Sequence, residues 1–118
     1  TIVATGLCVE SAVIAADMLE KDGIHARVIN IHTIKPIDEE ILVKAAKETG
    51  KIITVEEHSV IGGLGSAVCD VLCEKYPVPV KKLGIQDVFG YSGPALELIK
   101  EFKLDGQGVY GQIKDFLK

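Results

Sequence analysis

The sequence predicts a three-layer α/β/α sandwich built on a mainly parallel sheet of four strands. Short apolar runs alternate with helical patterns, the connections between them are short, and the strand-length runs are apolar almost throughout. Such alternation is typical of parallel strands joined by right-handed helical crossovers. Strands that are apolar on both sides need helices on both faces of the sheet. We expect the strand order 2-1-3-4 and one domain over residues 1–118.

The expected strands cover residues 1–4, 26–31, 51–55 and 80–85. Lys81 and Lys82 place the last of them at an edge of the sheet. Helices are expected over residues 10–21, 38–49, 93–102 and 108–117, and from Leu64 until Pro77 ends the pattern. Asp38 is a predicted N-cap, and Gly50 is the expected stop of the same helix.

Helical periodicity predicts which side chains face the core. The expected inward residues are Ala12, Ala16 and Leu19; Ile41, Leu42, Ala45 and Ala46; Leu64, Ala67, Val68, Val71 and Leu72; and Val109, Ile113, Phe116 and Leu117.

Composition excludes several classes of protein. The chain of 118 residues is 47% hydrophobic, carries a net charge of -4 and has no Trp. That hydrophobic content argues against disorder, and the acidic charge argues against binding to a phosphate backbone. No apolar run is long enough for a membrane span. Three cysteines without a disulfide pattern fit a reducing, cytoplasmic setting. The sequence begins inside an expected strand, so we expect it to be part of a longer chain.

In the order 2-1-3-4 the switch point lies between strands 1 and 3, and ligands or partners gather there. The segments 5–11 and 56–65 border this crevice. The polar residues on the same edge of the sheet are Glu56, Glu57, His32, His58 and Asp87, whereas His25 falls on the opposite edge.

The glycines at 62, 63 and 65 should open a helix, and a helix N-terminus attracts anions. They do not follow the strand directly in a G-x-G-x-x-G pattern, and no G-K-[ST] occurs. A tight turn with close helix packing is the favoured interpretation.

Glu56, Glu57 and His58 form the most polar cluster on the predicted site edge. A carboxylate could orient His58 as an acid or base, but adjacent residues of an extended segment point to opposite faces. A solvated strand end or a subunit contact is the favoured interpretation.

Cys69 and Cys73 lie four residues apart on one helix and could begin a zinc site. No second pair has ligand spacing, so we expect both to act as small buried hydrophobes. Cys8 begins a helix, where a thiolate would be favoured. The spacing of these residues thus predicts no self-sufficient active site. The chain either binds a ligand or partner without catalysing a reaction, or it is one part of a composite enzyme.

Four segments resemble the C-terminal domain of transketolases. They are Ile-Val-Ala-Thr-Gly at 2–6, residues 27–40, Val-Glu-Glu-His-Ser-Val-Ile-Gly-Gly-Leu-Gly-Ser-Ala-Val at 55–68, and Phe-Gly-Tyr-Ser-Gly at 89–93. The resemblance implies a thiamine-diphosphate and magnesium enzyme that moves a two-carbon ketol unit between sugar phosphates. It also implies a five-stranded domain, here without its first, antiparallel strand.

The resemblance further implies that the cofactor site belongs to other domains or to a separate section of a split enzyme. No catalytic, cofactor-binding or metal residue is therefore expected in this chain. Gly6, Glu57, His58, Gly62, Gly63 and Gly65 are candidates for an interface or switch-point surface. We expect a homodimer, or self-association through the exposed sheet edge or the Gly-rich surface.

Two alternatives stay open. Deoxyxylulose-phosphate synthase and, more loosely, the beta subunits of 2-oxoacid dehydrogenases share the Lys-Pro-Ile-Asp and Glu-Glu-His segments, although the segment at 89–93 favours transketolase. The other alternative is a flavodoxin-like regulatory module that binds a small anion at the switch point.

Overall fold

The sheet has the predicted order and direction. The computed structural model describes residues 1–32, 36–59, 63–85 and 103–118. Strands β1 (Ile2–Ala4), β2 (Val28–Asn30), β3 (Ile52–Ser59) and β4 (Val80–Ile85) form a four-stranded sheet in the order β2-β1-β3-β4. Every neighbouring pair is parallel, and Val3 stands between Ile29 of β2 and Thr54 of β3. The expected order 2-1-3-4 is therefore confirmed.

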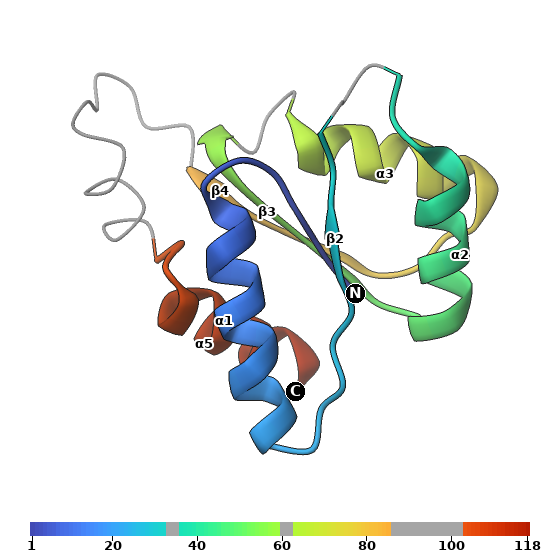
Figure 1. Cartoon of the computed structure of the whole chain (residues 1–118). Helices are drawn as coiled ribbons and strands as arrows, with labels where there is room; N and C mark the ends of the chain where they lie inside the picture. The colour runs from blue at the N-terminus through green and yellow to red at the C-terminus, as the bar shows by residue number, and fades with distance from the viewer. Residues whose placement is uncertain (33–35, 60–62, 86–102) are drawn as a thin grey trace.

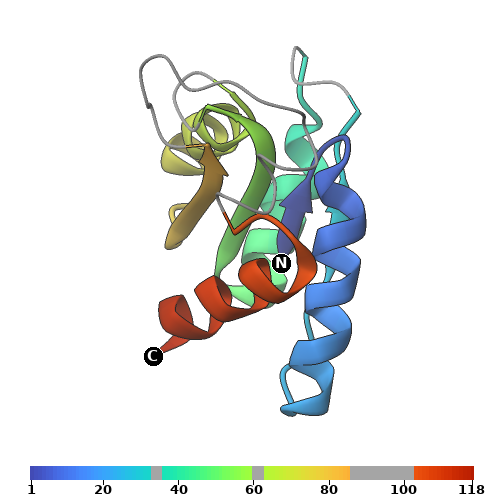
Figure 2. The ribbon, with the colours of Figure 1, turned by 90° about the vertical axis from the view of Figure 1, so that its left-hand side faces the viewer.

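Helices cover both faces of this sheet. Helices α1 (Cys8–Lys21) and α5 (Gly106–Leu117) lie side by side on one face, and α2 (Glu39–Thr49) and α3 (Leu64–Lys75) lie on the other (Figures 1 and 2). The three-layer sandwich is thus confirmed. The helix expected over 93–102 lies outside the described residues.

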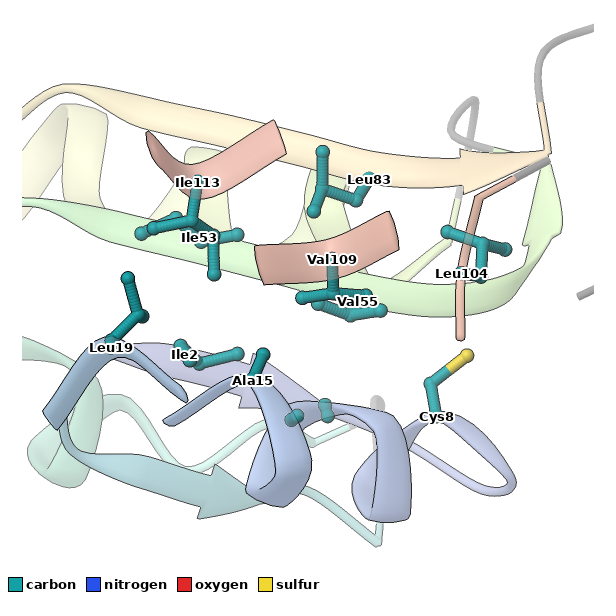
Figure 3. Close-up of a cluster of buried hydrophobic side chains, with 12 residues drawn as sticks. Ile2, Cys8, Ala15, Leu19, Ile53, Val55, Leu83, Leu104, Val109 and Ile113 are labelled. Carbon is teal, nitrogen blue, oxygen red and sulfur yellow. The ribbon is translucent and has the colours of Figure 1, made fainter. Parts of the chain in front are cut away.

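The strands divide their side chains between two cores because alternate residues point to opposite faces. Ile2, Ile53 and Val55 face α1 and α5, where Leu19, Val109 and Ile113 join them (Figure 3). Val3 and Ile52 face α2 and α3 and pack with the apolar stripes of those helices. The buried residues of this second cluster are Val3, Ile29, Ile31, Leu42, Ala45, Ala46, Ile52, Leu64, Val68 and Leu72.

The ends of α2 follow the predicted capping chemistry. The Asp38 carboxylate accepts a hydrogen bond of 3.2 Å from the Ile41 backbone N–H. Gly50 has a φ of 78°, a left-handed conformation that glycine adopts without the strain of a Cβ. Both predicted signals are confirmed.

Several boundaries and one helix face differ from the sequence prediction. β2 is shorter than the expected 26–31, and α5 starts at Gly106 rather than residue 108. β3 continues to Ser59, four residues beyond the predicted end, and α1 starts at Cys8 rather than residue 10. Ile41 is 38% exposed, although it was expected to face inward. It lies about 40° round the helix axis from Ala45, on the side away from Leu42 and Ala46, so it falls just beyond the edge of the buried stripe.

None of the helices within the described part of the chain has the length and apolar character needed to cross a membrane.

Truncation of Ile113 tests the packing of α5 on the sheet. Ile113→Ala removes a fully buried side chain from the α1/α5 core and should lower the free energy of unfolding by about 2–5 kcal/mol. Ile41→Ala removes the same atoms from an exposed position and should cost about 1 kcal/mol or less. Urea unfolding followed by circular dichroism measures both, and equal losses would contradict the described core.

Candidate functional site

The candidate residues lie where β1 and β3 end, at the switch point of the sheet. β1 and β3 are neighbours, and α1 leaves the end of β1 toward one face while α3 follows β3 on the other (Figure 1). The Thr5 backbone N–H donates to the Val55 carbonyl at 3.4 Å and ties the end of β1 to the middle of β3. The segments predicted to border the crevice, 5–11 and the described part of 56–65, do start from this point.

The carboxylate of Glu56 is almost completely buried, with 1% of the residue exposed. Its Oε1 accepts a hydrogen bond of 2.9 Å from the Leu64 N–H, and its Oε2 accepts one of 2.8 Å from the Gly65 N–H. These are backbone donors of the first turn of α3, which otherwise have no partner within a helix. The negative charge also meets the positive end of the helix dipole. Glu56 therefore occupies the anion-binding position of this helix with the chain's own carboxylate.

Close packing explains the need for glycine at position 65. A Cβ on Gly65 would lie 2.7 Å from Cγ of Lys82 and 2.9 Å from Oγ1 of Thr54. Gly63 precedes the helix as its N-cap residue and supplies no side-chain hydrogen bond. These contacts support the interpretation of a tight turn with close helix packing; Gly62 lies outside the described residues.

Glu57 points to the face opposite Glu56. A Cβ on Gly6 would lie 2.7 Å from Oε1 of Glu57, so this carboxylate sits over the turn that leads into α1. Gly6 has a φ of 55°, in the left-handed region that favours glycine. The expectation that the two glutamates diverge is confirmed. The His58 backbone belongs to β3, but its side chain lies outside what the structure describes.

The prediction of a favoured thiolate at Cys8 is wrong. Cys8 is fully buried in the α1/α5 core, in the same cluster as Leu104 (Figure 3). Burial, followed by the negative charges of Glu57 and Glu56, raises the pKa of the Cys8 thiol to about 12. Desolvation and two carboxylates outweigh the helix terminus, so the group is a neutral thiol at physiological pH.

The other two cysteines are not buried hydrophobes, which corrects the sequence interpretation. Cys73 is exposed and Cys69 is partly buried on α3. Burial, opposed by the charge of Lys82, raises the pKa of Cys69. The buried stripe of α3 runs through Val68, Val71 and Leu72, and the cysteines fall beside it. Among the described residues, no group of three or more His, Cys, Asp or Glu side chains is placed to hold a metal ion.

For the other two histidines, the structure describes no contact with the switch-point residues. His25 and His32 are both exposed, as expected of surface residues, and Asp87 lies outside the described residues. An open concavity of about 620 Å³ lies instead on the outer face of α2, lined by residues of α2 and by Lys75 rather than by the strand ends. Its carboxylates Glu39 and Glu48 are already paired with Lys75 and Arg27.

The fold and the Glu56 contact at the switch point define a three-layer α/β domain with a parallel sheet in the order β2-β1-β3-β4. Residues 1–109 match the family model described as "Transketolase, C-terminal domain". The chain belongs to this family, and the resemblance found in the sequence is confirmed.

Three relatives illustrate the match. One of the subunits of the apulose-4-phosphate transketolase of Phocaeicola vulgatus is 46% identical over 118 residues, which are 100% of this chain and 38% of that protein. A solved structure described as "Split gene transketolase, inactive beta4 tetramer" superposes with a TM-score of 0.88 at 49% identity, over 97% of this chain and 37% of that one. The 1-deoxy-D-xylulose-5-phosphate synthase of Heliobacterium modesticaldum is 43% identical over 92% of this chain and 17% of that protein. The chain thus spans little more than a third of the transketolase relatives and less of the synthase.

Replacement of Glu56 tests its role as the partner of the α3 terminus. Glu56→Ala leaves the buried N–H groups of Leu64 and Gly65 without an acceptor and should lower the free energy of unfolding by about 3 kcal/mol. Glu56→Gln keeps one acceptor oxygen and should cost less. Glu57→Ala is the matched control, with an expected cost of about 1 kcal/mol or less. Denaturant unfolding measures all three, and equal costs at 56 and 57 would refute the assignment.

Because the pKa of Cys8 is raised, the free energy of unfolding should change with pH in the alkaline range. The folded-state pKa of about 12 lies above the ordinary thiol value of 9.0, so the folded state holds the proton more tightly. The stabilisation is complete below pH 9 and is lost as pH rises toward 12. In Cys8→Ala, unfolding free energy should fall less steeply over this window than in the unaltered chain. Parallel pH profiles of the two proteins would contradict the buried thiol.

Proposed function

We propose that residues 1–118 form one non-catalytic C-terminal domain of a thiamine-diphosphate-dependent transketolase, which moves a two-carbon ketol unit between sugar phosphates. Membership of the family carries this proposal, and the coverage of the relatives supports it, since the chain corresponds to only little more than a third of their length. Beyond residue 109, α5 still packs through Ile113 on the same core as α1. The matched region and the end of α5 therefore share one core, as a single domain requires.

Within the part of the chain that the structure describes, the residues at the switch point do not fit the diphosphate and magnesium of the cofactor. A phosphate group would need free backbone donors at a helix N-terminus, and at α3 two of these donors are bonded to Glu56. A magnesium ion would need converging oxygen ligands, and the described residues converge on no such set. We therefore assign this chain no step of the reaction and place the cofactor, its magnesium and the chemistry on other polypeptide.

The role left for the domain is packing and subunit assembly, in a cytoplasmic dimer or larger complex. Gly6, Glu57, His58, Gly62 and Gly63 are the proposed contact surface toward the partner section. The relative described as an inactive beta4 tetramer supports an assembly role for this kind of subunit. Gly65 contributes indirectly, because it is buried and holds the start of α3 against Lys82 and Thr54.

One alternative enzyme rests on a specific observation. The synthase relative shares 43% identity over most of this chain, so the same domain could serve a deoxyxylulose-phosphate synthase. The coding sequence upstream of Thr1 distinguishes the two: a single polypeptide carrying both cofactor-binding domains favours the synthase, and a short subunit with only a pyrimidine-binding domain favours a split transketolase. The anion-sensing module is disfavoured because Glu56 already occupies the helix terminus.

Calorimetry tests the non-catalytic role directly. Titration of thiamine diphosphate with Mg²⁺ into the 118-residue chain should give no binding heat, because the α3 donors are engaged by Glu56. The chain alone should also leave a ketose phosphate donor and an aldose phosphate acceptor unchanged. The complete enzyme assembled from both sections should bind the cofactor and transfer the ketol unit. Tight cofactor binding or turnover by the chain alone would overturn the proposal.

A further inference from the structure

Helix α3 carries a pair of thiols that the assembly role does not use. Cys69 and Cys73 are four residues apart in one uninterrupted helix, Leu64–Lys75, and both are free. Residues at this spacing lie above one another on the same helix face. Cys73 is close enough to act electrostatically on Cys69, and Lys82 of the neighbouring β4 does so as well. The two sulfurs therefore share one face of α3, on the side toward the β4 edge of the sheet.

Solvent reaches this pair. Cys73 is exposed and lines an open depression of about 470 Å³, together with Glu39, Asp70, Val71 and Glu74. Cys69 is partly buried one turn earlier. The third thiol of the chain is separate, because Cys8 is the fully buried first residue of α1, on the opposite face of the sheet. A reagent in solution thus meets Cys73 first and finds Cys69 within one helical turn.

The spacing does not suit a disulfide. Helix positions four residues apart have Cβ atoms about 5–6 Å apart, whereas a disulfide needs a Cβ separation of about 3.5–4.5 Å. A bridging atom bonded to both sulfurs at about 2.3 Å, a typical metal–thiolate length, spans the longer gap without unwinding the helix. The described residues add no third ligand, so a four-coordinate zinc centre is not completed.

We propose that Cys69 and Cys73 form a chelating site for soft, thiophilic species that need only two protein sulfurs, such as trivalent organoarsenicals. The reaction with phenylarsine oxide illustrates the balance. Two thiols give up their protons, the As–O bond is replaced by two As–S bonds, and one water leaves. Arsenic stays trivalent, so no oxidant or reductant is needed. Thiol sulfur is the soft donor that such centres select.

The test uses phenylarsine oxide with the 118-residue chain, read by intact-protein mass spectrometry. The chain should take up one phenylarsenic group with loss of one water. Because the second thiol acts at high effective concentration, the adduct should need at least about 100-fold more monothiol for its removal than the adducts of Cys69→Ala or Cys73→Ala. A dithiol should remove it readily.

Cys8→Ala is the matched control and should keep the resistant adduct, since Cys8 lies on the other face of the sheet. Alanine is a strong helix former, so circular dichroism should show α3 intact in both cysteine variants and in the adduct. An adduct stripped by monothiol as easily as those of the single variants would overturn the proposal. So would loss of the resistant adduct in Cys8→Ala, or loss of helical signal on binding.

Discussion

The two hydrogen bonds from the start of α3 to Glu56 are the constraint on which the switch point depends. A carboxylate buried in the protein is costly unless donors replace its lost water. Here the donors are the N–H groups of Leu64 and Gly65, which themselves need an acceptor. Neither partner can be buried without the other. The pair therefore ties the end of β3 to the first turn of α3 and sets where that helix lies over the sheet.

The opposite face of the same strand end is filled in a related way. Glu57 lies over Gly6, and Cys8 is buried as the first residue of α1, where burial and then both glutamates raise its pKa. Open α/β sheets offer their ligand sites at this point. In this chain the Glu56 carboxylate of β3 accepts hydrogen bonds from two backbone N–H groups of α3 there. Among the described residues, the chain's own carboxylate thus takes the anion-binding position at the start of α3.

Much of this architecture follows from short-range signals. The Asp38 cap, the Gly50 stop and the stripe of Val68, Val71 and Leu72 each have a local physical cause, and each is confirmed. The wrong predictions concern residues at the border between the buried and the exposed side of a helix. Ile41 and Cys73 are apolar or weakly polar residues whose burial depends on how far the sheet and neighbouring helices extend, and periodicity carries no such information.

By itself the sequence determined the α/β alternation and the divergence of Glu56 from Glu57, because strand alternation and helical period are properties of a single segment. Only the tertiary structure decided that Glu56 accepts hydrogen bonds from a helix that starts eight residues later. It also decided that Cys8 is a neutral, buried thiol. Both outcomes depend on desolvation, which arises when separate segments pack together and exclude water.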